Sequence, residues 1–246
     1  MSEIEDKIAR FVGHFRAQCS RIADLGTERH HNLFKKTLYV AVIDALARSI
    51  YPRRGNRDRF VAFMKEFGAW NEAERVSLPH LVGLMTKAPD PVFSRLREFA
   101  LTELAKWAEG EYVPLSRDPS CDTIRRLWPP ERENRLPVGE ISLESLQHVH
   151  LLYVFRNSLV HELRELGYGI EIEKDTVPFY MSCTSYGLDD SSTAPGRKSW
   201  ELIYPVAFFE QLCNGALQRL EIYLRNSQLD PYAFHRFGSY WIVEIN

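Results

Sequence analysis

Residues 142–167, SLESLQHVHLLYVFRNSLVHELRELG, carry the longest uninterrupted helical pattern in the sequence. Ser142 suits a helix N-cap, and Gly167 follows where a left-handed C-cap belongs. Apolar residues recur along one side at helical spacing, namely Leu152, Phe155, Leu159, Leu163 and Leu166. We therefore expect one long helix whose apolar side is buried.

The opposite side of this predicted helix is polar. Four residues fall along it at spacings of seven, four and three: His150, Asn157, His161 and Arg164. Arg156 projects from the flank, between the polar and apolar sides. Such a combination is unusual for an element with only a structural role, so the search for function begins here.

The composition is that of an ordinary globular protein. The 246 residues are 45% hydrophobic and 26% charged, which is enough for one sizeable core or two small ones. The formal net charge of −2 gives no global basic field that would indicate a nucleic-acid partner. A local basic groove needs only a few arginines, however.

No apolar run approaches the roughly 18 residues that a membrane span requires, and the N-terminus lacks the apolar core of a signal peptide. We expect a cytoplasmic protein with no membrane partner. Four cysteines are widely scattered, without paired spacing: Cys19, Cys121, Cys183 and Cys213. We expect reduced thiols, no metal site and no cofactor.

Several further helices follow from the apolar periodicity. We expect them over about residues 3–24, 32–51 and 56–67, from about 78, and from about 90 to 108. The second of these should turn five residues inward: Phe34, Leu38, Val42, Ala45 and Leu46. The N-terminal half of the chain is therefore expected to be helical.

The pattern weakens from Glu109 to Glu140, where five prolines interrupt it. We expect a long Pro-rich loop there, with one helical turn at Thr123–Trp128. Farther on, three segments alternate in the manner of strands: 169–186, 197–204 and 237–245. A helix from Pro205 to about Asn226 separates the last two. The sequence thus predicts one mainly α domain over residues 1–246, with a small antiparallel β element near the C-terminal end.

The run Arg156-Asn157-Ser158-Leu159-Val160-His161 has the chemistry of phosphodiester cleavage. A histidine, whose ordinary pKa is about 6.5, can take a proton from a 2′-hydroxyl or give one to a leaving 5′-oxygen. An arginine can hold the non-bridging oxygens as charge builds, and an asparagine amide can orient either partner. No metal is needed when the attacking group is the 2′-hydroxyl of RNA itself.

This run resembles the signature of the HEPN superfamily (higher eukaryote and prokaryote nucleotide-binding domains). In that family a helical bundle carries an arginine, usually followed by a polar residue, and a histidine four to six residues beyond. The resemblance implies a HEPN-like bundle with additional N-terminal helices. It also implies a metal-independent endoribonuclease, a hydrolase that binds RNA as a homodimer in a toxin–antitoxin or anti-phage defence role. Arg156 and His161 match the catalytic pair, and Asn157 matches the polar position.

A regulatory protein or antitoxin is a further expected partner. In HEPN toxins silenced by a nucleotidyltransferase, a tyrosine stands two residues after the histidine, whereas this chain has Leu163. That mode of control is therefore not supported. Arg75 and His80 repeat the spacing of the motif, but Pro79 lies between them in a poor helical segment.

Other residues are secondary candidates for contacting a substrate. His150 and Arg164 share the polar side of the motif helix. The turn that contains Arg53, Arg54 and Arg57 is the densest basic cluster, and it could contact phosphate or be merely solvated. The alternative function is a non-catalytic HEPN-like helical domain that binds a protein partner or a nucleotide. An unrelated helical fold with a coincidental motif stays open as well.

Overall fold

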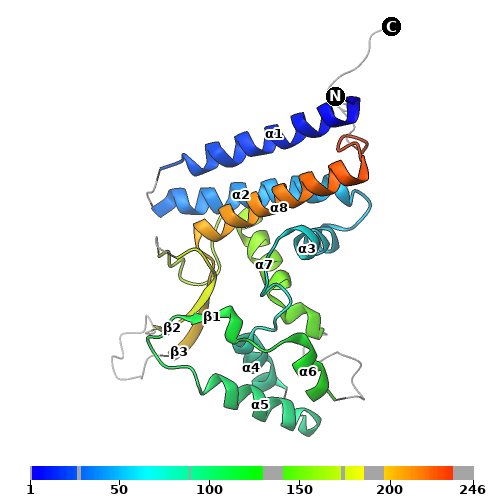
Figure 1. Ribbon diagram of the computed structural model, residues 1–246. Helices are drawn as coiled ribbons and strands as arrows, with labels where there is room; N and C mark the ends of the chain where they lie inside the picture. Colours follow the sequence, from blue (N-terminus) through cyan, green and yellow to red (C-terminus); the bar gives the residue numbers. More distant parts are fainter. Residues whose placement is uncertain are drawn as a thin grey trace. The chain divides into compact units, whose positions relative to one another are not determined.

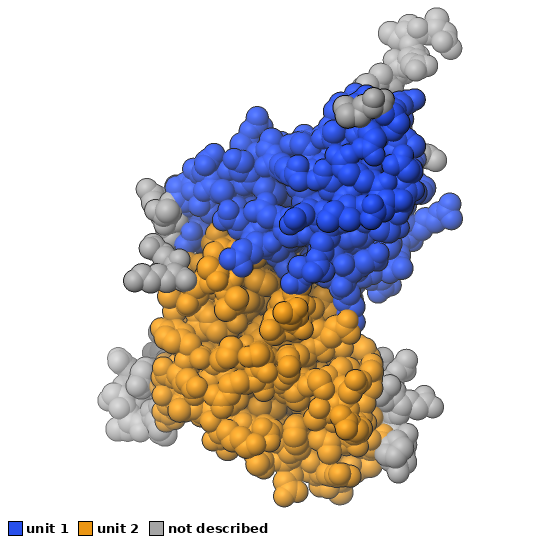
Figure 2. Space-filling view, in the orientation of Figure 1, with its two compact units in different colours: residues 1–69, 210–246 blue, residues 70–209 orange. Residues whose placement is uncertain are grey.

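The computed structural model describes residues 2–26, 29–88, 90–129, 141–172, 175–185 and 197–234. The chain is mainly α-helical with a small three-stranded antiparallel sheet, as predicted. It divides into two compact units, which Figure 2 colours separately. Unit 1 comprises residues 1–69 and 210–246, and unit 2 comprises residues 70–209. Each unit is considered by itself, so the expectation of one domain stays a prediction.

Unit 1 is built from helices α1 (Glu3–Ala23), α2 (Arg29–Ile50), α3 (Asn56–Phe67) and most of α8 (Val206–Ser227). All four agree with the predicted helices within a few residues. Phe60, Phe63, Met64 and Phe67 of α3 are buried, as the periodicity of that helix predicts. Lys35 Nζ donates to the Ala23 carbonyl at 3.0 Å, so α2 satisfies a carbonyl at the C-terminal end of α1.

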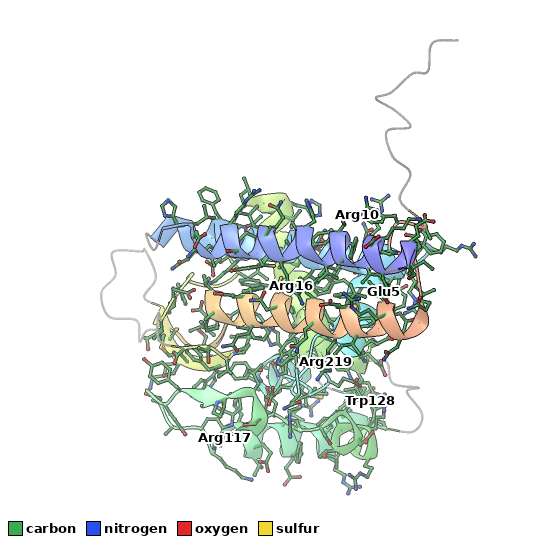
Figure 3. All side chains as sticks on the ribbon, turned by 45° about the horizontal axis from the view of Figure 1, so that its top comes forward. Glu5, Arg10, Arg16, Arg117, Trp128 and Arg219 are labelled. Carbon is green, nitrogen blue, oxygen red and sulfur yellow. The ribbon has the colours of Figure 1, made fainter. Side chains whose placement is uncertain are left out.

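Ion pairs between mostly half-buried side chains join α1 to α8, and the two helices run side by side in Figures 1 and 3. Arg16 on α1 pairs with Glu221 on α8 at 2.5 Å. Arg225 pairs with Glu5 and also, at 2.9 Å, with Glu221. Figure 3 labels Glu5 and Arg16 on α1. Because these pairs form a connected network, they orient the two helices more firmly than isolated surface pairs would.

The inner face of α2 is partly wrong in the sequence prediction. Phe34 and Leu38 keep 47% and 43% of their surface exposed, and Ala45 is exposed as well. Tyr39 and Ile43 are fully buried instead. The helix carries apolar residues on most of its circumference, so hydrophobicity alone did not identify the buried side.

Unit 2 contains shorter helical elements. They are α4 (Leu78–Lys87), η1 (Pro91–Phe93), α5 (Ser94–Leu104), η2 (Leu115–Arg117), α6 (Cys121–Leu127), η4 (Leu143–Leu146), α7 (His148–Asn157) and η5 (Ser158–Glu162). Asp90 caps the turn at Pro91 by accepting from the Val92 amide at 3.0 Å, as the sequence indicates. Buried residues of α4, α5 and α6 join one apolar core with Tyr180 of the sheet.

The sheet has the order β1-β2-β3, from β1 (Val113–Pro114), β2 (Phe179–Ser185) and β3 (Arg197–Ile203). β2 and β3 pair antiparallel from Phe179↔Ile203 to Ser185↔Arg197, as two of the predicted strands should. β1 pairs with β2 through Val113↔Tyr180. The third strand of this sheet therefore comes from the region predicted as a loop. The predicted strand at 237–245 lies outside the described residues.

The long Pro-rich loop predicted over 109–140, with one helical turn at 123–128, contains more secondary structure in its described part than predicted. Residues 113–127 contain β1, η2 and the two-turn helix α6, which covers residues 123–127 of the turn predicted at 123–128. Ser120 caps α6 by accepting from the Thr123 amide at 3.1 Å. Residues 130–140 lie outside the described residues. Proline ends elements here, but it does not prevent short ones from forming.

The single long helix predicted over 142–167 is also wrong. Its first turn is the 3₁₀ helix η4, and Gln147 is then extended before α7 begins at His148. Gln147 is held in a bridge with Val76, and the amides of His148 and Val149 donate to the carbonyls of Arg75 and Ala73. These long-range hydrogen bonds take the first amides of α7 and end the helix on its N-terminal side.

Candidate functional site

The predicted catalytic residues meet at the C-terminal end of α7. Arg156 Nη1 donates to Asn157 Oδ1 at 2.9 Å and lies 3.3 Å from His161 Nε2. A guanidinium only donates, so Nε2 accepts, and the proton of the imidazole is then on Nδ1. His161 is exposed, whereas Arg156 and Asn157 are half-buried. The structure thus joins an arginine, an amide and an accessible histidine through one guanidinium.

A local departure from the α-helix makes this contact possible. In a regular α-helix, residues five apart point about 140° away from each other. From Ser158 to Glu162 the chain forms the π-helical turn η5, in which the Leu163 amide donates to the Ser158 carbonyl. A π turn spreads one turn over more residues, which narrows the angle between positions five apart. His161 is therefore directed back toward Arg156.

The helix ends just after the motif. Leu163 has φ 49° and ψ 40°, the left-handed conformation of a helix C-cap, and its side chain is 60% exposed. Ser158 Oγ donates to the Arg164 carbonyl at 2.9 Å and closes the turn. The cap thus falls four residues before Gly167, although Gly167 also has a positive φ of 79°. Of the predicted apolar side, Leu152, Phe155 and Leu159 are buried, while Leu163 is not.

Two of the secondary candidates lie on the same element. Arg164 is exposed, and its Nε donates to Glu162 Oε2 at 2.5 Å, so its charge is partly engaged beside the motif. His150 is half-buried at the start of α7, about two turns or roughly 10 Å from Asn157 along the axis. Of these two, Arg164 is the residue placed near the motif.

The basic turn belongs to unit 1, whereas the motif belongs to unit 2. Arg53, Arg54 and Arg57 are all exposed there. The guanidinium carbon of Arg54 lies 4.3 Å from the ring centroid of Tyr51, a cation–π contact that holds the side chain against the protein. These arginines and the motif are described in separate units, and contact of the arginines with a substrate stays a prediction.

Within the ranges described above, no group of three or more His, Cys, Asp or Glu side chains is arranged to hold a metal ion. No helix in that part of the chain is both long and apolar enough to cross a bilayer.

A second group of polar side chains, the buried network, lies inside unit 2. Asp118 is 1% exposed, and its Oδ2 lies 2.6 Å from His148 Nε2 and 2.9 Å from Tyr180 Oη. Tyr180 Oη also lies 2.7 Å from Ser77 Oγ, which in turn lies 2.7 Å from His80 Nδ1. Hydrogen bonds therefore run without a break from His148 to His80.

Asp118 also anchors the start of α4. Its Oδ1 accepts from the Leu78 amide at 2.9 Å, and Arg75 Nη1 donates to its main-chain carbonyl at 2.5 Å. A buried carboxylate is tolerated only where such donors replace water, and Asp118 receives donors on both oxygens. The network thus fixes the loop before α6 against α4, α7 and β2.

Burial changes the proton affinities in this network. It lowers the pKa of His80, with a smaller contribution from His148 and partial opposition from Asp118. Part of the His80 surface is open to solvent, so desolvation of its ring is incomplete. Burial also raises the pKa of the Tyr180 hydroxyl, and the charge of Asp118 adds to this effect. His80 therefore favours its uncharged form more than an exposed histidine does.

His80 faces a pocket of about 260 Å³ that is formed entirely by residues of unit 2. The pocket lies between α7, the segment 166–168 and β3. Aromatic rings contribute to its wall, among them Phe155, Trp200 and Tyr204. The structure thus contains two candidate sites, the motif at the end of α7 and this pocket.

The sequence did not indicate the second place. Pro79 argues against a second copy of the motif at Arg75 and His80. Proline is nevertheless well accommodated in the first turn of α4, which contains His80. Asp118 lies in the segment predicted as a loop, and His148 lies 30 residues farther along the chain. No short spacing connects these residues, because only the tertiary fold brings them together.

No protein-family model matches the chain, and neither a curated protein nor a solved structure shows significant similarity to it.

Proposed function

We propose that the protein is a metal-independent endoribonuclease of the HEPN type that cleaves RNA through attack of its 2′-hydroxyl. The observation that carries the proposal is the contact of Arg156 Nη1 with both Asn157 Oδ1 and His161 Nε2. An exposed histidine beside a guanidinium is the minimal equipment for moving a proton next to a phosphate. The toxin or anti-phage role follows only from the resemblance.

The Arg156–His161 contact indicates how binding and catalysis are linked. A phosphodiester oxygen is a stronger partner for a guanidinium than an uncharged imidazole nitrogen. Bound RNA is therefore expected to draw Arg156 onto the scissile phosphate and to free His161 Nε2. Asn157 Oδ1 accepts from the same Nη1 and keeps the guanidinium near the phosphate.

The freed Nε2 then accepts the proton of the 2′-hydroxyl. The 2′-oxygen forms a bond to phosphorus, the bond from phosphorus to the 5′-oxygen breaks, and the 5′-oxygen takes up a proton. The products are a 2′,3′-cyclic phosphate and a 5′-hydroxyl. Arg156 stabilises the charge that builds on the non-bridging oxygens during this step.

The proposed active form is a homodimer in which a second histidine gives the proton to the 5′-oxygen. Leu163 and Val154 keep 60% and 48% of their surface exposed close to the motif. Apolar side chains at this position are suited to burial against a second copy. His161 would then lie in a groove shared by the two chains.

The direct test is cleavage of a labelled single-stranded RNA by the purified protein in excess EDTA. Arg156→Ala and His161→Ala should each reduce the rate by roughly 10²-fold or more, which is the usual contribution of a general base or of charge stabilisation. Arg95→Ala and His14→Ala are matched controls, because both residues are exposed and lie outside the motif. These two variants should cleave as the wild type does.

Thermal unfolding of all five proteins checks that the changes affect the chemistry and not the fold. Equal cleavage by the motif variants and the wild type would falsify the assignment. Complete loss of activity in EDTA would contradict the metal-independent mechanism. Detection of a 2′,3′-cyclic phosphate end supports attack by the 2′-hydroxyl over attack by water.

The alternative is a non-catalytic domain that uses the polar side of α7 to bind a protein partner or a nucleotide. Exposure of Leu163 and Val154 is compatible with it, since a protein partner could cover them. RNA that binds but is never cleaved, with binding weakened by Arg156→Ala, would favour this alternative. The accessible, hydrogen-bonded imidazole of His161 supports the enzyme more strongly.

A further inference from the structure

The pocket in unit 2 has the lining of a small-molecule site. Its walls are mostly apolar, and Phe155, Trp200 and Tyr204 present aromatic surface. Two side chains beside it, Val154 and Tyr168, keep 48% and 53% of their surface exposed. Such a lining favours a flat, largely uncharged ligand that can place its faces against rings.

Glu201 is the charged side chain of this pocket, but its oxygens are already in use. Oε1 accepts from the Tyr168 amide at 2.7 Å, and Oε2 lies 3.4 Å from the Cys183 thiol. Only 8% of Glu201 is exposed. The carboxylate therefore fixes segment 166–168 to β3, and a cationic ligand has little to gain from it.

His80 is the polar group that can meet a ligand. Its Nδ1 is held by Ser77 Oγ, so Nε2 is the ring nitrogen that a molecule in the pocket can reach. Whether Nε2 donates or accepts depends on where the proton of the ring lies. The position of this proton follows from the hydrogen bonds of the buried network, when they are followed from Asp118 to His80.

Asp118 is a carboxylate and can only accept. Tyr180 has one proton, and placing it on Asp118 satisfies the buried charge best. With that proton used, the 2.7 Å contact between Tyr180 Oη and Ser77 Oγ is left to the proton of the Ser77 hydroxyl, and Ser77 Oγ in turn accepts from a proton on His80 Nδ1. His80 Nε2 is left with its lone pair, so it presents a hydrogen-bond acceptor to the pocket.

Tyr204 contributes to the wall of the same pocket. It is 3% exposed, and its hydroxyl has no hydrogen-bond partner among the described residues. Because the hydroxyl is closed off from solvent, Tyr204 presents its ring and not a hydrogen-bonding group to the pocket. The pocket therefore combines aromatic walls with one hydrogen-bond acceptor.

We propose that this pocket binds a small planar heteroaromatic molecule, which packs against Phe155 and Trp200 and donates an N–H hydrogen bond to His80 Nε2. The volume of about 260 Å³ lies just below the usual range of about 300–1,000 Å³ for ligand pockets, which favours one or two fused rings. Such a ring is either a free small molecule or the base of a nucleic-acid strand. The proposal uses neither Arg156 nor His161, and it does not depend on the nuclease function.

The test uses two probes that differ in one group. Benzimidazole carries the N–H, and 1-methylbenzimidazole replaces its hydrogen with a methyl group. Calorimetric titration of the full chain should show saturable binding of benzimidazole at one site, with the methylated probe weaker by about fivefold or more, the worth of one hydrogen bond. Equal affinity of the two probes, or no saturation by benzimidazole up to its solubility, would overturn the proposal.

Two substitutions of His80 make the test specific for Nε2. In His80→Asn the side-chain amide can replace Nδ1 beside Ser77, but no atom replaces Nε2. In His80→Gln the longer amide can place an oxygen near the position of Nε2. The asparagine variant should bind both probes equally weakly, whereas the glutamine variant should keep part of the preference for benzimidazole.

A fall in affinity for both probes by the same factor in His80→Asn would show a merely structural role and would contradict the hydrogen bond. Tyr204→Phe serves as an independent variant, because it keeps the ring and removes the unsatisfied hydroxyl. Tyr204→Phe should leave the ratio of the affinities for benzimidazole and 1-methylbenzimidazole unchanged. Melting temperatures establish that each variant is folded before its binding is compared.

Competition identifies the source of the ring. Adenine and a 2′-O-methyl single-stranded hexanucleotide, which cannot be cleaved through its 2′-oxygen, are each added to the benzimidazole complex. Displacement by adenine alone supports a free small molecule as the ligand. Displacement by the hexanucleotide as well supports the base of a strand.

Discussion

At the scale of single residues, two glycines should respond to the same substitution in opposite directions. Gly167 has φ 79°, and a Cβ there would lie 2.3 Å from Glu201 Oε1, which is held by the Tyr168 amide. Gly167→Ala should lower the free energy of unfolding by roughly 1–2 kcal/mol, the usual cost of a left-handed L-residue. Gly13 lies inside α1 with no atom near its virtual Cβ, so Gly13→Ala should raise that free energy by about 0.5–1 kcal/mol. Urea unfolding measures both, and a loss of stability in Gly13→Ala would contradict the argument.

Residue-level predictability differs between the two candidate sites. Arg156, Asn157 and His161 lie within six positions of the chain, so their grouping could be predicted from the sequence once a helix was assigned. Asp118 and Tyr180 form the buried network only through the tertiary fold, and neither has a local signal. The resemblance to HEPN proteins implies roles for Arg156, Asn157 and His161, and it implies none for the residues of the buried network.

At the scale of elements, the strained cap of the motif helix gives a prediction. Leu163 adopts a left-handed conformation with 60% of its surface exposed in a single chain, so in a dilute, monomeric sample it loses little burial when replaced. Leu163→Gly relieves roughly 1–2 kcal/mol of strain, against roughly 0.5–1 kcal/mol of added chain entropy in the unfolded state. We expect a net gain in stability of about 0.5–1 kcal/mol in chemical denaturation. Val154→Gly, at an exposed position inside α7, is the matched control and should be destabilising; a loss of stability in Leu163→Gly would contradict the cap assignment.

Element boundaries followed from the sequence where one helix has one buried face. For α1, α3 and α8 the apolar period identified the span within a few residues, and for α3 it also identified the buried residues. In α2 the period was present, but it did not distinguish the exposed Phe34 from the buried Tyr39. The prediction of one long helix around α7 was wrong for another reason. Long-range hydrogen bonds form the bridge between Val76 and Gln147, and the π turn after Asn157 is a local feature that the apolar period does not indicate.

At the scale of the whole molecule, both candidate sites belong to unit 2, while unit 1 contributes a helical bundle tied by ion pairs. The predicted fold class is confirmed, since helices dominate and the sheet is small and antiparallel. Its third strand, β1, could not be predicted, because a two-residue strand that contains Pro114 has no period to detect. Strands of this length exist only through their partner, which here is β2.

The proposed homodimer makes the active unit larger than one chain, and this leads to a prediction about mixtures. If each composite site needs His161 from both copies, an excess of the His161→Ala variant should lower the activity of the wild-type chains by exchanging subunits with them. At a tenfold excess, random exchange leaves about one wild-type chain in eleven with a wild-type partner, so activity should fall by about tenfold. RNA is kept in saturating excess so that the inactive variant cannot act by sequestering substrate, and sedimentation establishes that mixed dimers form. Unchanged activity per wild-type chain despite mixed dimers would mean that one copy of the Arg156–His161 pair is sufficient, and that the two chains need not share a site.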